Sequence, residues 1–201
     1  MTERDGAMGD DAGLVARVLA GEAEAFRELF TRYQRLVLGL ATRLLNDRDE
    51  ANDICQEVFL TVHRRLTTLR EPDKLCAWLC RITLTRVYNA ERSFRRRLRA
   101  FTISFDETVS RATPYQGPHG DPERALFASE TRRRLDDALA ALPLQYRTVV
   151  VLRDIEGLSY EEIAEATDAN LGTVKSRLAR GREILRRSLH DLIGWHRETR
   201  S

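Results

Sequence analysis

Four side chains in the segment 172–189 are of the types that proteins use to read DNA sequence. They are Lys175, Ser176, Ala179 and Arg180. Each helical residue adds about 100°, so these four share one side of a predicted helix. An apolar stripe takes the other side: Val174, Leu178, Gly181, Leu185 and Leu189. A helix that docks through an apolar stripe and offers basic and hydroxyl groups opposite fits the major groove of DNA.

The residues before this segment predict the rest of a helix-turn-helix. Ser159 and Glu162 have the spacing of a capping box, which predicts a helix through the sequence YEEIAEAT. Asp168, Ala169 and Asn170 supply the turn, because Asp and Asn tolerate left-handed backbone. The alternative is an amphipathic helix whose charged face is only solvated. A capping box, a tight turn and a basic helix in succession favour DNA binding over that alternative.

A second basic surface is predicted on the helix that begins at Pro72 and runs to about Arg99. Its members are Arg81, Leu84, Thr85, Tyr88, Arg92, Arg95 and Arg99. Guanidinium groups suit phosphate, and stacking of an unpaired base on an aromatic ring contributes about 1–3 kcal/mol. This composition favours contact with unpaired nucleic acid over a solvated helix end. Trp78, beside Leu75 and Ile82, is expected in the core instead.

The helix before it carries an acidic and amide face. That face consists of Asp49, Glu50, Asp53, Gln56 and Glu57. Carboxylates repel DNA, so the two interpretations left open are a solvated surface and a surface for a protein partner.

Apolar residues at helical spacing predict an all-α fold of two small helical domains joined by a flexible linker. The helices expected in the first domain are 12–20, 22–45, 49–66 and 72–99. Proline and glycine crowd into the end of the stretch 100–122, which predicts an extended linker. Helical spacing then resumes over 123–142 and 143–157, ahead of the helix-turn-helix. The chain is therefore divided into a tail 1–11, a domain 12–99, the linker 100–122, a domain 123–195 and a tail 196–201.

Composition argues against several other classes of protein. The formal net charge is only +2 although 32% of the residues are charged, so the basic residues act as clusters. The four histidines are scattered, and no phosphate-binding loop or nucleophile elbow is present, so we expect no enzyme and no cofactor. No stretch has the features of a signal peptide or a membrane span, which predicts a soluble, cytoplasmic protein.

The cysteines could in principle bind metal or take part in redox chemistry. Cys76 and Cys80 are four residues apart, Cys55 is distant in sequence, and His63 is the only other candidate ligand. We expect buried, unmodified thiols and no metal site.

With these motifs in order, the chain resembles the extracytoplasmic-function (ECF) group of bacterial sigma factors, in the sigma-70 family. DICQEVFLTVHRRL is similar to the family's polymerase-binding helix, and WLCRITLTRVYNAERSFRRR to its promoter-melting helix. The stretch from LDDALAALP to GREIL resembles the whole sigma-four domain. The resemblance makes 12–99 a sigma-two-like domain and 123–195 a sigma-four-like domain.

The resemblance also implies a role for individual residues. The residues expected to grip the β′ subunit of core RNA polymerase are Asp53, Gln56, Glu57 and Phe59. Those expected at the −10 element are Lys74, in the base-capturing loop, and Arg81, Thr85, Tyr88, Asn89 and Arg92. Those expected at the −35 element are Lys175, Ser176, Ala179 and Arg180, with Arg147 and Tyr160 as phosphate contacts. Thr85 and Asn89 depart from the family, which often has Asn and Asp there, so its −10 preference is not carried over.

The partners that the resemblance implies are core RNA polymerase, through its β′ and β subunits, promoter DNA and an anti-sigma factor. No large C-terminal extension is seen, which favours control by a separate anti-sigma protein. The rival interpretation is a stand-alone helix-turn-helix regulator that dimerises on a palindrome. That rival leaves the arginine-rich helix and the acidic face without a role.

Overall fold

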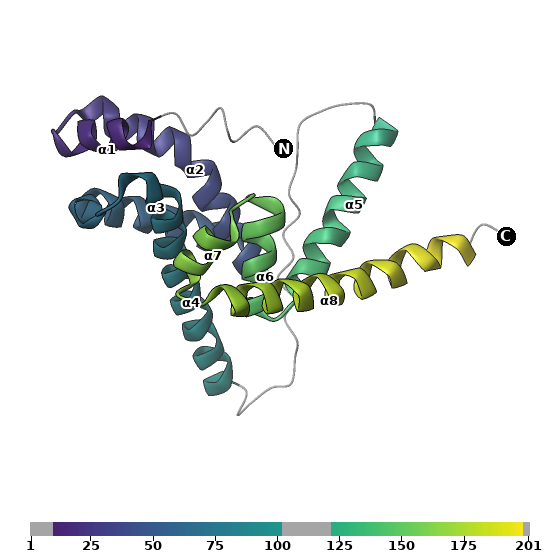
Figure 1. Cartoon of the computed structure of the whole chain (residues 1–201). Coiled ribbons are helices and arrows are strands. Elements are labelled where there is room, and N and C mark those ends of the chain that lie inside the picture. The colour runs from purple at the N-terminus through teal and green to yellow at the C-terminus, as the bar shows by residue number, and fades with distance from the viewer. Residues whose placement is uncertain (1–9, 102–121, 199–201) are drawn as a thin grey trace.

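The computed structural model describes residues 10–101 and 122–198, with side chains described over 10–94, 96, 131 and 133–190. All the regular structure in these residues is helical (Figure 1). The predicted all-α fold is confirmed. Most of the predicted linker, residues 102–121, lies outside the described residues, as do residues 1–9 of the predicted tail 1–11 and residues 199–201 of the predicted tail 196–201.

The N-terminal half, residues 10–101, is built on three long helices and one short one. Its elements are α1 (Asp11–Leu19), α2 (Ala23–Leu45), α3 (Arg48–Arg65), the 3₁₀ turns η1 (Leu66–Thr68) and η2 (Pro72–Lys74), and α4 (Leu75–Phe101). Asn46 ends α2 in the left-handed conformation, as expected for a turn residue. The helix predicted from Pro72 begins instead as the tight turn η2, which places Lys74 before the first residue of α4.

A buried carboxylate fastens α1 to α2. Asp11 is only 7% exposed, accepts a hydrogen bond from the hydroxyl of Tyr33, and pairs with Arg32 at 2.9 Å. A buried carboxylate is tolerated only when it is paired in this way. Burial also raises the pKa of the Tyr33 phenol, so its hydroxyl stays protonated as the donor.

The C-terminal half, residues 122–198, contains α5 (Pro122–Ala141), α6 (Leu144–Val150), the π-helical turn η3 (Val151–Ile155), α7 (Tyr160–Thr167) and α8 (Leu171–Glu198). One uninterrupted helix was expected over 143–157, but its second part winds as η3, with Glu156 N donating to Val151 O at 2.9 Å. Helix α8 runs past its predicted end at Leu189, because no proline follows and the lone Gly194 is tolerated within a helix. No helix within the described ranges is both long and apolar enough to span a membrane.

The helix-turn-helix has the predicted local structure. Ser159 Oγ accepts from Glu162 N at 3.1 Å, and the Glu162 carboxylate accepts from Ser159 N at 2.7 Å. Asp168 is left-handed, with φ 53°, and Asn170 Oδ1 accepts from Thr173 N at 2.7 Å, so Asn170 caps α8. The backbone N–H groups of Glu162 in α7 and Thr173 in α8 thereby each have a side-chain acceptor three residues earlier.

Gly181 brings α8 close to α6. A Cβ atom at Gly181 would lie 2.7 Å from Val150 Cγ2 and 3.3 Å from the carbonyl oxygen of Tyr146. The apolar stripe that includes Gly181 therefore docks on α6, with Val174 and Leu178 almost fully buried. This leaves the opposite side of α8 exposed.

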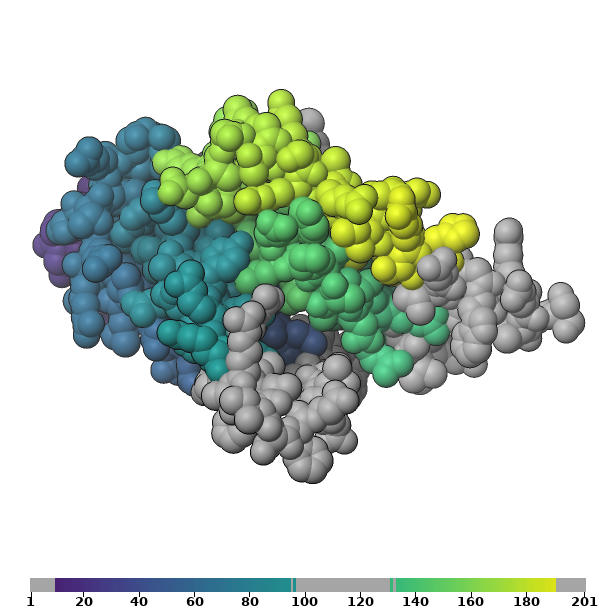
Figure 2. All heavy atoms as spheres, turned by 90° about the horizontal axis from the view of Figure 1, so that it is seen from below, coloured from purple at the N-terminus to yellow at the C-terminus, as the bar shows by residue number. Residues whose placement is uncertain are grey.

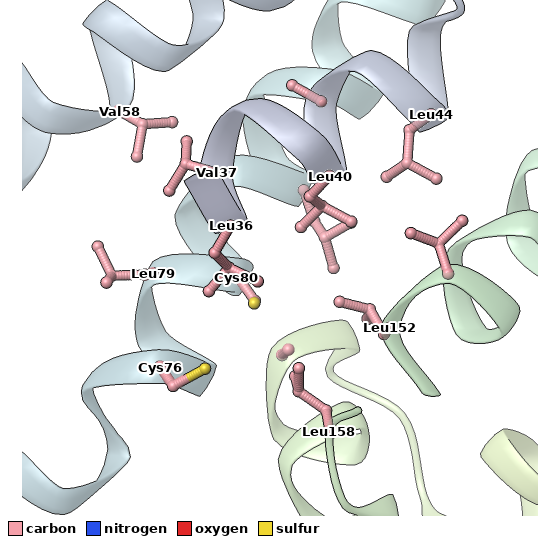
Figure 3. Close-up of a cluster of buried hydrophobic side chains, with 14 of the residues drawn as sticks. Leu36, Val37, Leu40, Leu44, Val58, Cys76, Leu79, Cys80, Leu152 and Leu158 are labelled. Atoms are coloured by element: carbon pink, nitrogen blue, oxygen red, sulfur yellow. The ribbon is translucent and has the colours of Figure 1, made fainter. Parts of the chain in front are cut away.

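The two halves share one hydrophobic core. Leu36, Leu40 and Leu44 of α2 belong to the same buried cluster as Leu152 and Leu158 of the C-terminal half (Figure 3). Helix α4 also packs on α7 (Figure 1). The sequence predicted two domains without indicating how they are arranged, and the structure packs them together.

Loss of the capping box should destabilise the C-terminal half. We expect Ser159→Ala to lower the free energy of unfolding by about 1 kcal/mol, since an orphan helix N–H loses its acceptor. Ser176→Ala is the matched control, because its hydroxyl only donates to the carbonyl of Thr173. Urea denaturation measures the free energy of unfolding of both variants, and the m-value should be the same as in the wild type. Equal midpoints for the two variants would contradict the assigned role of Ser159.

Candidate functional surfaces

The basic face of α8 is exposed as predicted. Lys175, Ser176, Ala179 and Arg180 all lie on the surface. Val174 and Leu178, on the reverse of the helix, are 0% and 2% exposed. The first turns of α8 therefore offer two cations, a hydroxyl and a small side chain that leaves space, which is the chemistry of base-edge and phosphate recognition.

Tyr160 lies at the centre of a group of cations. The guanidinium of Arg153 lies 4.9 Å from the centre of its ring, and Nζ of Lys175 lies 5.9 Å from it. Arg182 is held beside this group by Asp154, whose Oδ2 accepts from Nε at 2.9 Å. Cation–π attraction orients Lys175 toward the start of α7, so the ring of Tyr160 supports the exposed basic face of α8. Sequence reasoning assigned Tyr160 only a phosphate contact and missed Arg153, Asp154 and Arg182.

Arg147 does not lie on that face. Its guanidinium points inward and donates to three backbone carbonyls, those of Leu44 at 2.6 Å, Leu142 at 3.0 Å, and Ala140. Such carbonyls are left unpaired where helices end, and a cation satisfies them and the helix dipole. In this arrangement Arg147 is a structural contact between the halves, and it is not available to a DNA phosphate.

The predicted −10 face of α4 is largely exposed. Arg81, Thr85, Asn89 and Arg92 lie on the surface, whereas Leu84 is only 2% exposed and belongs to the core. The hydroxyl of Thr85 donates to its own helix, at the carbonyl of Arg81. Trp78 packs against the core, as expected. The side chains of Arg95 and Arg99 lie outside the described residues.

Two members of the −10 set contact the C-terminal half. Tyr88 is 37% exposed, and its hydroxyl shares a 3.0 Å hydrogen bond with Thr148 of α6. Nζ of Lys74 pairs with Glu71 at 3.0 Å and with Glu165 of α7 at 3.5 Å. The hydrogen bond to Glu71 is the main cause that raises the pKa of Lys74, so the ammonium stays charged. Figure 2 shows α4 (blue to teal) and the α7–α8 region (yellow-green) in contact along this boundary.

The acidic and amide face of α3 is exposed and borders an apolar patch. Asp53, Gln56 and Glu57 lie on the surface, and Glu57 pairs with Arg86 at 3.1 Å. Phe59, predicted to contact the polymerase, is only 4% exposed. It packs against Phe30 of α2, with ring centres 4.6 Å apart, and so supports the surface from below.

The apolar contact area beside that face comes from residues that sequence reasoning missed. Phe30 is 37% exposed and Leu60 is 57% exposed. Leu60 follows Asp53 by seven residues and Gln56 by four, so helical spacing alone indicates that it shares their face. An exposed apolar patch rimmed by carboxylates is typical of a protein-binding surface.

The three cysteines are buried and are not disulfide-bonded. The described residues contain no group of three His, Cys, Asp or Glu side chains arranged to hold a metal ion. Burial raises the pKa of the Cys55 thiol, which lowers the fraction present as reactive thiolate.

Comparison with known proteins identifies the family. The model of Sigma-70 region 2 matches residues 29–99, and that of Sigma-70 region 4 matches residues 132–185. The RNA polymerase sigma-H factor of Pseudomonas aeruginosa is 35% identical over 188 residues, covering 91% of this chain and 95% of that protein. The ECF RNA polymerase sigma-E factor of Haemophilus influenzae is also 35% identical, over 91% and 97% of the two chains. The chain belongs to the ECF group of the sigma-70 family.

Solved sigma-factor structures have the same fold. Bartonella quintana RpoE, in a complex with the anti-sigma factor NepR, gives a TM-score of 0.68 at 24% identity over 84% of this sigma factor and 98% of that chain. CnrH, in a complex with the cytosolic domain of CnrY, gives 0.62 at 23% identity over 90% and 97%. Region 2 covers α4 of this sigma factor as far as residue 99, and region 4 covers α7 and the first part of α8, as far as residue 185.

The raised pKa of Cys55 predicts slow alkylation. At pH 8 we expect iodoacetamide to modify Cys55 more slowly in the folded protein than in urea, because only the thiolate reacts and burial raises the pKa of this thiol. The rate should increase as the pH rises toward the raised pKa. Mass spectrometry of the peptide containing Cys55 measures this, and equal rates in folded and unfolded protein would contradict the assignment.

Proposed function

We propose that this sigma factor binds core RNA polymerase through α3 and directs transcription initiation by reading a −10 element with α4 and a −35 element with α8. The observation that supports this most is that each matched family region carries its own exposed polar helix surface. Region 2 exposes Arg81, Asn89 and Arg92, and region 4 exposes Lys175 and Arg180. A single-site DNA-binding protein needs only one such surface.

In the −35 contact, α8 enters the major groove with its N-terminal turns. Lys175 and Arg180 approach base edges or phosphates, while the small Ala179 lets the helix lie close to the DNA. Tyr160 and Arg153 keep Lys175 oriented. Each base-specific contact contributes about 1–3 kcal/mol to discrimination.

In the −10 contact, α4 binds a strand that has left the duplex. Opening DNA costs about 1.4 kcal/mol of stacking per base-pair step. Stacking of a released base on Tyr88, together with phosphate contacts from Arg81 and Arg92, offsets part of that cost. This is binding chemistry and requires no bond cleavage.

Core RNA polymerase would hold together two domains that each bind DNA weakly on their own. When both domains are held on the enzyme, the second DNA contact becomes intramolecular and its effective concentration rises. The α3 face, with Phe30 and Leu60 beside Asp53, has the mixed apolar and acidic character suited to such a partner. An anti-sigma factor, of the kind seen with Bartonella RpoE, is proposed as the controlling partner.

Run-off transcription tests the proposal as a whole. The purified chain is mixed with bacterial core RNA polymerase and genomic fragments, and the transcript starts are sequenced. Discrete starts that share two upstream motifs would support an initiation factor. Tight binding to a palindrome by the protein alone, without dependent transcripts, would support the stand-alone regulator instead.

Loss of a cation from the exposed face of α8 should weaken −35 recognition. We expect Lys175→Ala or Arg180→Ala to reduce initiation from a −35-dependent promoter by roughly 5- to 150-fold, equivalent to about 1–3 kcal/mol. Arg186→Ala is the control, because Arg186 is exposed on the same helix and pairs with Glu183. Transcription that is unchanged in both test variants would refute the assignment.

A reversed charge on α3 should abolish polymerase binding. We expect Asp53→Arg to prevent co-elution with core enzyme because it reverses a charge on the exposed face of α3. Leu60→Asp should have the same effect because it places a charge on the apolar part of that face. Helical content should stay constant in both variants. Asp137→Arg makes the same charge change on the exposed side of α5 and should co-elute normally. Retained co-elution of Asp53→Arg would count against this surface.

A further inference from the structure

Arg86 of α4 belongs neither to the −10 set on its own helix nor to the acidic and amide face of α3. Its neighbours Thr85 and Asn89 are exposed with the −10 set, whereas the guanidinium of Arg86 bonds to α3, which packs beside α4 (Figure 1). Among the α4 arginines whose side chains the structure describes, Arg86 alone bonds to another described helix. This contact directs Arg86 away from the −10 surface and indicates a different role.

Arg86 contacts two residues of α3 at once. Its Nη1 pairs with Oε2 of Glu57 at 3.1 Å, and its Nη2 donates to the hydroxyl of Thr61 at 3.0 Å. The Thr61 hydroxyl in turn donates to the backbone carbonyl of Glu57 at 2.8 Å. Arg86, Thr61 and Glu57 therefore form a closed network, which restrains both the backbone and the carboxylate of Glu57.

The packing of α3 on α4 does not depend on this network. Val58 and Val62 of α3 and Val87 of α4 are all 0% exposed and belong to the hydrophobic core. The side chains of Arg86 and Glu57, by contrast, are 40% and 56% exposed. Ion pairs at such exposure add little to stability, because water and salt screen them and two long side chains must be ordered. The main effect of the network is therefore on the orientation of Glu57.

Glu57 lies at the centre of the α3 face proposed to bind polymerase. Asp53 precedes it by four residues and Leu60 follows it by three, so helical spacing places all three on one side. The pair with Arg86 uses Oε2 of Glu57, and Oε1 makes no ion pair or hydrogen bond within the described residues. A cation of a partner can therefore approach Oε1 while Arg86 holds Oε2.

We propose that Arg86 is a positioning residue for polymerase binding. Together with Thr61 it holds the Glu57 carboxylate in the orientation that meets a cation of the polymerase, and it acts through Glu57 without contacting the polymerase itself. This role rests on the function proposed for the α3 face. A side chain that is ordered before association lowers the entropy cost that binding would otherwise include.

The sign of the effect separates positioning from simple electrostatics. An acidic face attracts a cationic partner, so removal of a nearby positive charge strengthens binding if charge alone matters. Loss of the orientation of Glu57 weakens binding instead. We expect Arg86→Met to bind core RNA polymerase roughly two- to tenfold more weakly than wild type, which corresponds to the ordering cost of one flexible side chain.

A double-mutant cycle tests whether Arg86 acts through Glu57. Dissociation constants for immobilised core RNA polymerase are measured for wild type, Arg86→Met, Glu57→Ala and the double variant. In the Glu57→Ala background, Arg86→Met should cause no further loss, because no carboxylate remains to be positioned. Arg86→Lys keeps the charge beside Glu57 and should recover part of the affinity that Arg86→Met loses.

Thr61→Val gives a second, independent test of the network. It keeps the branched shape of the side chain and removes only the hydroxyl that bridges Arg86 and the carbonyl of Glu57. It should weaken polymerase binding in the same direction as Arg86→Met, and it retains the test if Arg86→Met impairs folding. Arg186→Met is the matched control, since it removes an exposed arginine that pairs with Glu183 at 3.0 Å, and it should leave the affinity unchanged.

The possible outcomes distinguish this role from a structural one and from the proposed function. Urea denaturation of Arg86→Met should give the wild-type midpoint, which excludes loss of the fold as the cause of weaker binding. Equal or tighter polymerase binding by Arg86→Met, or an undiminished loss in the Glu57→Ala background, would overturn the positioning role. Wild-type protein that does not bind core polymerase at all would overturn the proposed function, and the role of Arg86 with it.

Discussion

The leucines that α2 and the C-terminal half bury against each other set the arrangement of everything else. Leu40 and Leu44 lie near the end of α2, in the same buried cluster as Leu152 and Leu158. Once these side chains are in contact, the carbonyl of Leu44 lies within reach of Arg147, and Tyr88 within reach of Thr148. The polar contacts depend on the apolar one, because hydrogen bonds need a geometry that packing must first provide.

Two side chains proposed to contact the −10 element, Tyr88 and Lys74, also make contacts between the two halves of the chain. A ligand shifts a conformational equilibrium only through its different affinities for the two states. Single-stranded DNA bound to α4, as proposed above, would compete with the contacts that Tyr88 and Lys74 make to the C-terminal half.

The local parts of the molecule were predictable from the sequence, and the parts that depend on distant residues were not. Ser159 with Glu162, and Asp168 with Asn170, specify the helix-turn-helix within a dozen residues. Arg147 has its partner at Leu44, over a hundred residues away in sequence, so spacing could not reveal that it points inward. Phe59 was assigned to a surface by its position in a motif, but contact with Phe30 of another helix buries it. Leu60 was available to the same periodicity argument and was overlooked.

The contacts made by the π-helical turn η3 and the residue after it depend on the number of residues in this segment as well as on their side chains. Within this short stretch Arg153 contacts Tyr160, Asp154 holds Arg182 of α8, and Glu156 reaches across to Arg43 of α2. Removal of one residue would restore ordinary winding and rotate the helix-turn-helix by about 100°, so all three partners could no longer be met at once. Side chains here can be exchanged one at a time, but the insertion or deletion of one residue would disrupt all three contacts in one step.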